Sequence, residues 1–233
     1  MSEYWQFTAM EKEALWLSLK VACWCVLVSL PFGIACSWVL VRCQFYGKII
    51  LEMLVHLPLV MPPIATGYAL LVLFGKQGFF GYWLDELLGI SFAFSWKGAV
   101  LASMIVSFPL LVRALTISLE SLDLGLEEVA KTLGASSFRV FFTITLPLIV
   151  PGILSGMMLT FARSLGEFGA TITFVSNIQG ETMTLPLAMF NLIQQPNTEN
   201  ATLRLFVLSV VLAVTALFAS EQLNRWIQKN RAV

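Results

Sequence analysis

The sequence predicts an all-α integral membrane protein that forms a single transmembrane domain. Of the 233 residues, 58% are hydrophobic and only 12% are charged, whereas charged residues make up roughly 25% of a typical soluble protein. Several apolar stretches are long enough to cross a bilayer, which takes about 20 helical residues. A soluble fold of this length could not bury so much apolar surface, and the formal net charge of zero gives no indication of a nucleic-acid partner.

The first predicted span, 15–41, follows acidic residues and is longer than the apolar part of a secretory signal. We therefore expect it to stay in the protein as a transmembrane helix. All four cysteines lie in or beside this span, and we expect them to be small apolar side chains. The other predicted spans, about five in all with the first, are 49–74, 98–117, 141–161 and 203–220.

The second predicted span contains the adjacent prolines Pro62 and Pro63. Each proline removes a backbone donor, and its ring clashes with the preceding turn, so we predict a break near Met61. A single proline more often gives only a kink that lets packed helices fit. The carbonyl groups freed by an adjacent pair need partners that lipid does not supply, so we expect this break to line a pathway.

Residues 169–193 form a weaker apolar region. Its two apolar pieces are each too short to span a bilayer, and they flank the polar segment NIQGET at 177–182. Irregular backbone at membrane depth is tolerated only against protein or a water-filled cavity. We therefore expect short helices or re-entrant chain near one membrane face.

Lysine and arginine are distributed unequally between the two alternating sets of loops. One set carries eight, namely Arg42, Lys48, Arg113, Lys131, Arg139, Arg225, Lys229 and Arg231. The other carries three, namely Lys12, Lys76 and Lys97. By the positive-inside rule, residues 42–48, residues 118–140 and the C-terminus face the cytoplasm, and five spans then place the N-terminus outside.

The polar segment 121–137 interrupts the spans with a helix, a glycine and a second helix. Four apolar residues with the spacing i, i+3, i+4 and i+7 share one face of the first helix, and they are Leu126, Val129, Ala130 and Leu133. Such a face can dock into a groove of another protein. The alternative is a helix lying on the membrane surface, although surface helices usually carry more basic residues than this segment does.

The ends of these two helices also have recognisable signals. Asp123, Glu127 and Glu128 place negative charge at the start of the first helix, which its dipole favours. Gly134 suits a left-handed helix end. Ser136 or Ser137 can then cap the helix that leads into the fourth span.

The same segment resembles the EAA signature of ABC importer permeases. The matching pieces are EVAKTLG at 128–134 and ITLP at 144–147, with Val129 where the family usually has alanine. The residues that correspond to the signature are Glu128, Ala130, Gly134, Leu146 and Pro147. In this family the segment is the coupling helix, so the resemblance implies that 121–137 inserts into a cleft of a cytoplasmic ATPase subunit.

The resemblance extends from about residue 17 to residue 223 and is strongest to the permeases of molybdate importers, of the type I, MetI-like class. It rests on HLPLVMPP at 56–63, FAFSWKGAVLA at 92–102, FFTITLPL at 141–148 and ARSLGEFGATITFVSN at 162–177. It implies a homodimer of permeases in the bacterial inner (plasma) membrane. It also implies two ATPase subunits that bind ATP and Mg, and an extracytoplasmic protein that delivers the oxyanion.

The chain itself offers little that could catalyse a reaction. It lacks the GxxxxGK[ST] motif, so in an ATP-driven process the nucleotide binds another polypeptide. His56 is the only histidine, and we expect it to be packed or hydrogen-bonded rather than to bind a metal. Without a cluster of histidine, cysteine and carboxylate groups, the sequence indicates neither a metal site nor a membrane enzyme.

Arg163 and Glu167 lie near the end of the fourth span and are four residues apart, so they can pair on one helix face. Ionisable groups inside a membrane are costly and often functional, and we expect the pair to shape a gate. The alternative is that it only braces the helix end. Thr160, Ser164 and Thr171 could offer hydroxyl donors to a passing oxyanion, although such side chains more often bond to their own helix.

We expect two copies to enclose the pathway, because five spans are few for one chain to do so alone. Gly152, Ser155 and Gly156 would allow the close helix approach that such a dimer needs. The alternative cargoes are tungstate, sulfate and thiosulfate, which are anions of similar shape and charge. A secondary transporter is less favoured, because the chain shows no second half related by an inverted repeat.

Overall fold

The computed structural model describes residues 7–231, with side chains described except at positions 88, 220, 221 and 223–231. Within this range every regular element is helical, which confirms the predicted all-α class. The elements are α1 (Ala9–Arg42), α2 (Lys48–Val60), α3 (Pro63–Phe74), α4 (Phe79–Leu88), α5 (Trp96–Glu120), α6 (Leu124–Thr132), α7 (Ser137–Val140), the π-helix η2 (Phe141–Thr145), α8 (Leu146–Leu165), α9 (Gly169–Val175), α10 (Leu185–Ile193) and α11 (Glu199–Arg231).

Four helical segments of the described chain are long and apolar enough to cross a membrane. They are α1, α5, the continuous stretch from α7 to α8, and the first 21 residues of α11. The bent pair α2–α3 gives a fifth crossing if it is counted as one span. The predicted spans are therefore confirmed as helices, although α1 begins six residues earlier than predicted, at Ala9.

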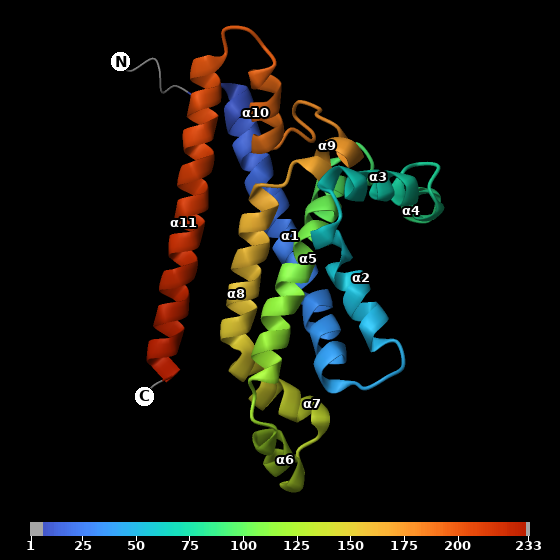
Figure 1. Ribbon diagram of the computed structural model, residues 1–233, viewed down its shortest axis with the longest axis vertical. Coiled ribbons are helices and arrows are strands. Elements are labelled where there is room, and N and C mark those ends of the chain that lie inside the picture. The colour runs from blue at the N-terminus through green and yellow to red at the C-terminus, as the bar shows by residue number, and fades with distance from the viewer. Residues whose placement is uncertain (1–6, 232–233) are drawn as a thin grey trace.

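The second span is not a straight crossing. Its two halves, α2 and α3, meet at an angle of 117°, and α3 runs across the long helices instead of along them (Figure 1). The break falls at Met61 and Pro62, as the sequence predicted, because both residues adopt extended backbone with ψ of 141° and 134°. Residues that precede a proline are driven out of the helical region in this way.

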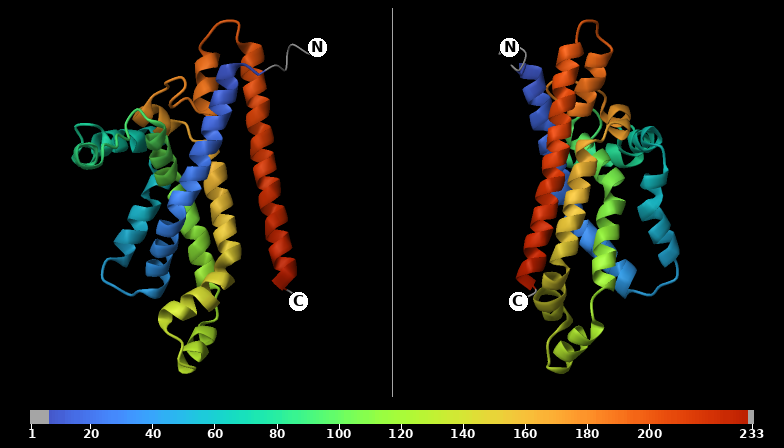
Figure 2. Two further views of the ribbon diagram at one scale, coloured as in Figure 1. Left: turned by 180° about the vertical axis from the view of Figure 1, so that it is seen from behind. Right: turned by 60° about the vertical axis from the view of Figure 1, so that its left-hand side comes forward.

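Helices α1, α5 and α8 lie side by side and form the centre of the molecule (Figures 1 and 2). A Cβ added to Gly33 of α1 or to Gly156 of α8 would come within 2.7 or 2.8 Å of the Leu111 side chain on α5. A Cβ on Gly152 would lie 2.3 Å from Cβ of Ser118. Gly152 and Gly156 therefore serve packing inside one chain, and the expectation that they form the contact between two copies was wrong.

The weak region 169–193 forms two short helices, α9 and α10, as expected. The loop between them is closed by Thr182, whose hydroxyl donates to the carbonyl of Ser176 and accepts from the backbone N–H of Ile178 at 3.1 and 2.9 Å. Both helices lie toward the end of the molecule where α1 begins (Figure 1). Neither is long enough to span a bilayer.

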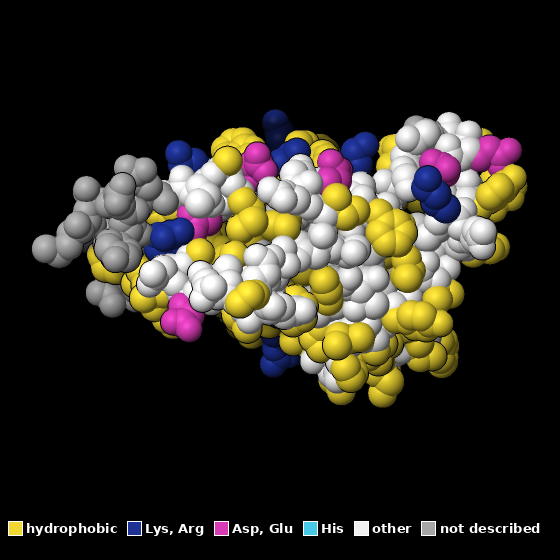
Figure 3. All heavy atoms as spheres, turned by 90° about the horizontal axis from the view of Figure 1, so that it is seen from above, with side chains coloured by type: hydrophobic (Ala, Val, Ile, Leu, Met, Phe, Trp, Pro, Cys, Tyr) yellow, Lys and Arg dark blue, Asp and Glu magenta, His cyan; other side chains and the backbone are white. Residues whose placement is uncertain are grey.

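The two ends of the molecule differ in the chain segments and charged side chains that lie there. The end that holds α6, α7, the α1–α2 connection and the last turns of α11 gathers the segments predicted to be cytoplasmic (Figure 1). The side chains of Arg225, Lys229 and Arg231 lie outside the described set. Figure 3 views the opposite end, where acidic and basic side chains lie among hydrophobic ones. There Arg204 of α11 pairs at 2.9 Å with Glu11 of α1, whose side chain is fully buried.

Candidate coupling helix and translocation site

The segment 121–137 forms the helix, glycine turn and second helix that the sequence predicted. The Asp123 carboxylate accepts the backbone N–H of Gly125 at 2.9 Å and so caps the start of α6. Gly134 has a φ of +88°, in the left-handed region that favours glycine. The Ser136 hydroxyl then accepts the backbone N–H of Arg139 and caps α7.

The apolar face of α6 is open to the surroundings of the chain. Leu126, Val129 and Leu133 are all exposed, Leu133 to 83%, and Ala130 is half-buried. Glu128, the glutamate of the EAA signature, is also exposed. Of the nine residues of α6, all of which are described, only Glu127 is buried. The helix is therefore not held to the membrane bundle by its apolar residues.

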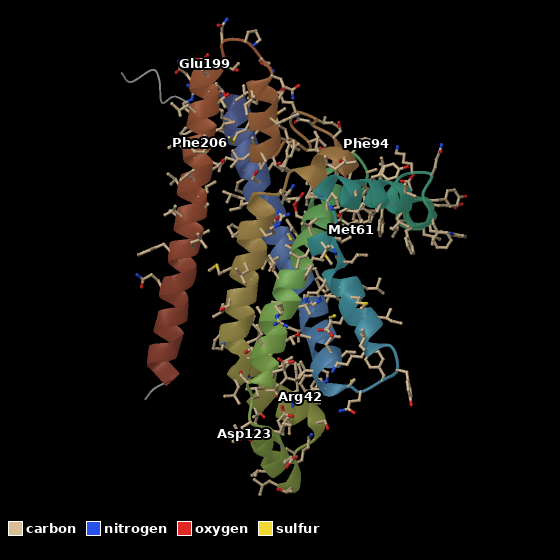
Figure 4. The ribbon with its side chains drawn as sticks, in the orientation of Figure 1. Arg42, Met61, Phe94, Asp123, Glu199 and Phe206 are labelled. Atoms are coloured by element: carbon tan, nitrogen blue, oxygen red, sulfur yellow. The ribbon has the colours of Figure 1, made fainter. Side chains whose placement is uncertain are left out.

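Glu127 has a role that the sequence did not reveal. Its Oε1 lies 2.7 Å from Nη2 of Arg42 at the end of α1, and it accepts the hydroxyl of Thr145 at 2.9 Å. Figure 4 shows Arg42 near the end of the molecule that holds α6. The sequence predicted Glu127 only as a favourable charge at a helix start. No spacing rule connects it to an arginine 85 positions earlier.

The second part of the EAA signature begins α8 directly after a π-helical turn. The backbone N–H of Leu146 bonds to the carbonyl of Phe141, five residues earlier. Pro147 follows and has no N–H to offer to the carbonyl of Thr143, four residues earlier. Leu146 is half-buried and Pro147 is exposed. The signature thus places an irregular turn where the coupling segment joins the fourth span.

Arg163 and Glu167 pair as predicted, with 2.8 Å between Nη1 and Oε2. They do not share one helix face, however, because α8 ends at Leu165 and Glu167 lies in the turn before α9. The Glu167 side chain is 2% exposed and that of Arg163 is 32% exposed. Oε1 of Glu167 also accepts the backbone N–H of Ala170 at 2.9 Å, so this carboxylate caps the first turn of α9.

The three predicted hydroxyl donors face the interior of the chain. Thr160, Ser164 and Thr171 are all buried. The Thr171 hydroxyl donates to the carbonyl of Phe168 at 2.8 Å, which is the local bond that the alternative interpretation named. The Ser164 hydroxyl lies beside the thiol of Cys25. In this arrangement none of the three hydroxyls is presented to a pathway on the surface of the chain.

The proline break and the Glu167 turn lie against each other. A Cβ added to Gly169 would be 2.6 Å from Cβ of Pro63, and one added to Gly67 would be 2.5 Å from the carbonyl oxygen of Ala170. Two glycines thus let α3 and α9 touch backbone to backbone. Pro62 and Pro63 remain exposed at the edge of this contact. The structure therefore brings together the two regions that the sequence predicted to line a pathway.

Residues 29–230 match the family described as the binding-protein-dependent transport system inner membrane component. The chain belongs to this family. It is 58% identical, over 95% of its length and 96% of the relative, to the molybdenum transport system permease protein ModB of Escherichia coli (strain K12). It is 56% identical to the protein of the same name from Haemophilus influenzae, over 94% and 96% of the two chains. The resemblance to molybdate importer permeases that the motifs indicated is confirmed.

The fold is also that of solved importers. A bacterial alginate ABC transporter, solved in complex with an alginate pentasaccharide-bound periplasmic protein, contains a chain that matches with a TM-score of 0.75 at 17% identity. The match covers 95% of this chain and 81% of the other. At this identity the likeness concerns the fold alone, and it confirms the predicted permease architecture.

Proposed function

We propose that this chain is the membrane-spanning permease subunit of an ATP-driven importer of molybdate. The observation that carries the proposal is the 58% identity to a molybdenum transport permease over nearly the whole of both chains. The motif in α6 and the fold support the same class of protein. Tungstate, sulfate or thiosulfate is the alternative cargo, because these anions resemble molybdate in shape and charge.

In the proposed importer two copies of this chain associate, and each docks α6 into one ATPase subunit. The exposed apolar face of α6 supports this docking, because its three large apolar side chains are each at least half exposed within the described chain. ATP and Mg bind the ATPase subunits, and this chain binds no cofactor. The α6 end faces the cytoplasm of a bacterial cell, the N-terminus lies outside the inner membrane, and an extracytoplasmic protein delivers the oxyanion.

The pathway runs between the two copies, along the exposed prolines Pro62 and Pro63. Arg163 is one-third exposed, pairs with Glu167 in the connection before α9 and offers positive charge to an anion. Its pairing with Glu167 offsets that charge, so that the anion is attracted but not trapped, as transport requires. Thr160, Ser164 and Thr171 are buried in this conformation, and they reach the anion only when α8 and α9 move relative to α1 and α5.

The test is reconstitution of the permease with its ATPase subunit in proteoliposomes that contain ATP. Uptake of labelled molybdate should require ATP and the binding protein on the outer side. Competition with unlabelled tungstate, sulfate and thiosulfate then identifies the cargo. Uptake that is driven by an ion gradient without the ATPase subunit would contradict the proposal. Preferential uptake of sulfate would identify sulfate, the alternative cargo, as the transported anion.

A further inference from the structure

The coupling helix α6 is attached to the membrane bundle through a carboxylate. Its apolar side chains point away from the bundle, and its one buried residue is the charged Glu127, which is 7% exposed. Apolar packing is non-directional and lets surfaces slide. A charge-assisted hydrogen bond, in contrast, fixes the position of both partners. The attachment of α6 therefore has a defined geometry at one point.

Three separate elements meet at that point. Oε1 of Glu127 receives Nη2 of Arg42, from the last turn of α1, at 2.7 Å. The same oxygen receives the hydroxyl of the fully buried Thr145, from the π-helix η2, at 2.9 Å. One carboxylate oxygen thus holds the docking helix to the ends of two membrane helices, α1 and the α7–α8 segment.

Aromatic contacts join the same two helix ends. The Arg42 guanidinium lies 5.7 Å from the ring centroid of Trp38, and Trp38 meets Phe141 edge-on at 5.1 Å. Phe141 and Thr145 are the first and last residues of η2. Single π-helical turns inside a helix are frequent at functional sites. Movement of η2 would carry α8, whose far end leads to the Arg163–Glu167 pair.

We propose that Arg42, Glu127 and Thr145 form the mechanical link that transmits movement of α6 to α1 and α8. They are positioning residues, which touch neither the ATPase subunit nor the anion. Separating Glu127 from Arg42 would leave a buried charge unpaired, so α6 and the two helix ends move together. This inference rests on the proposed function, since it assumes that α6 is driven by an ATPase subunit.

The test uses the full complex of permease, ATPase subunit and binding protein in proteoliposomes. Variants Glu127→Gln and Arg42→Met should still co-purify with the ATPase subunit and hydrolyse ATP at the basal rate. The anion taken up per ATP hydrolysed should fall about tenfold, within the usual range of coupling between sites. Arg42→Lys keeps the positive charge, and Thr145→Val removes only one hydrogen bond. The anion taken up per ATP should therefore fall less in these two variants.

Glu11→Gln is the matched control. It disrupts an ion pair of similar length, 2.9 Å between Glu11 and Arg204, at the opposite end of the molecule. A merely structural effect would lower the yield of the complex without changing the anion taken up per ATP. The double variant Arg42→Met with Glu127→Gln should take up as much anion per ATP as either single variant, because both changes remove the same link.

Three results would overturn the inference. The first is an unchanged uptake per ATP in Glu127→Gln. The second is a loss of uptake per ATP in Glu127→Gln that is no greater than the loss in Glu11→Gln, and the third is failure of Glu127→Gln to bind the ATPase subunit. The last result would place Glu127 in the docking interface itself. Absence of ATP-dependent uptake in the unmodified complex would instead contradict the proposed function, so the two failures are distinguishable.

Discussion

Replacing Gly67 by alanine should separate α3 from α9. The added Cβ would lie 2.5 Å from the carbonyl oxygen and 2.9 Å from Cα of Ala170. Ordinary contact begins at about 3.4 Å, so the two helices must move apart by about 0.9 Å. These two atoms belong to the backbone of α9, and the Cβ of Thr173 also lies at 2.9 Å, so none of them can rotate aside as the end of a long side chain would.

The magnitude follows from two opposing terms. Overpacking a tight contact costs about 1–3 kcal/mol. Alanine in a helix interior is favoured over glycine by about 1 kcal/mol, which offsets part of this cost. We expect a net loss of stability of about 1 kcal/mol. Because α3 begins at the proline break, the shift also moves Pro63 away from Gly169, and anion uptake should fall.

Thermal unfolding of the purified permease in detergent measures the first effect. A loss of 1 kcal/mol lowers Tm by roughly 2–4 °C in a chain of this size. Uptake in proteoliposomes measures the second effect. Gly166→Ala is the matched control, because a Cβ there meets no atom within 4 Å, and its φ of −93° suits any residue. If Gly67→Ala were as stable and as active as Gly166→Ala, the close contact of α3 with α9 would be refuted.

Three further predictions address the coupling turn, the orientation and the ion pair. Gly134→Val places a β-branched residue at a φ of +88°, which costs about 1–2 kcal/mol; uptake and stimulated ATP hydrolysis should fall together while membrane insertion stays normal, and unchanged coupling would count against a docking role. In a background without the native cysteines, Tyr46→Cys should react with an impermeant thiol reagent only from the cytoplasmic side of vesicles, and Gln179→Cys only from the outer side; the reverse pattern would invert the proposed topology. Arg163→Gln should lower Tm more than Glu167→Gln does, because only the former leaves a buried carboxylate unpaired; equal effects would count against a stabilising ion pair between the two side chains.

The sequence alone determined the features that depend on neighbours along the chain. Apolar stretches of sufficient length specified the long helices, because a helix satisfies its own backbone groups in lipid. Adjacent prolines specified the break at Met61, since a proline constrains the residue just before it. Asp123, Gly134 and Ser136 specified the ends of the coupling helices, because caps act within about four residues. The EAA match specified the family.

Other features could be decided only by the tertiary structure. No local rule gives the 117° angle between α2 and α3, because a break permits many directions and packing, including the close contact of Gly67 with α9, selects one. Gly152 and Gly156 signal close approach to some helix, but the partner proved to be α5 of the same chain. Thr160 and Ser164 share a helix face in the sequence, yet that face points inward.

The clearest case is Glu127 and its neighbour Glu128. Both are acidic residues in the N-terminal half of one short helix, and the sequence gives them the same helix-dipole role. The fold buries one against Arg42, 85 residues away, and leaves the other exposed. Helical geometry separates adjacent side chains by about 100° around the axis, so they meet different surroundings. Which surroundings each meets depends on where α1 ends in space, and only the assembled bundle sets that position.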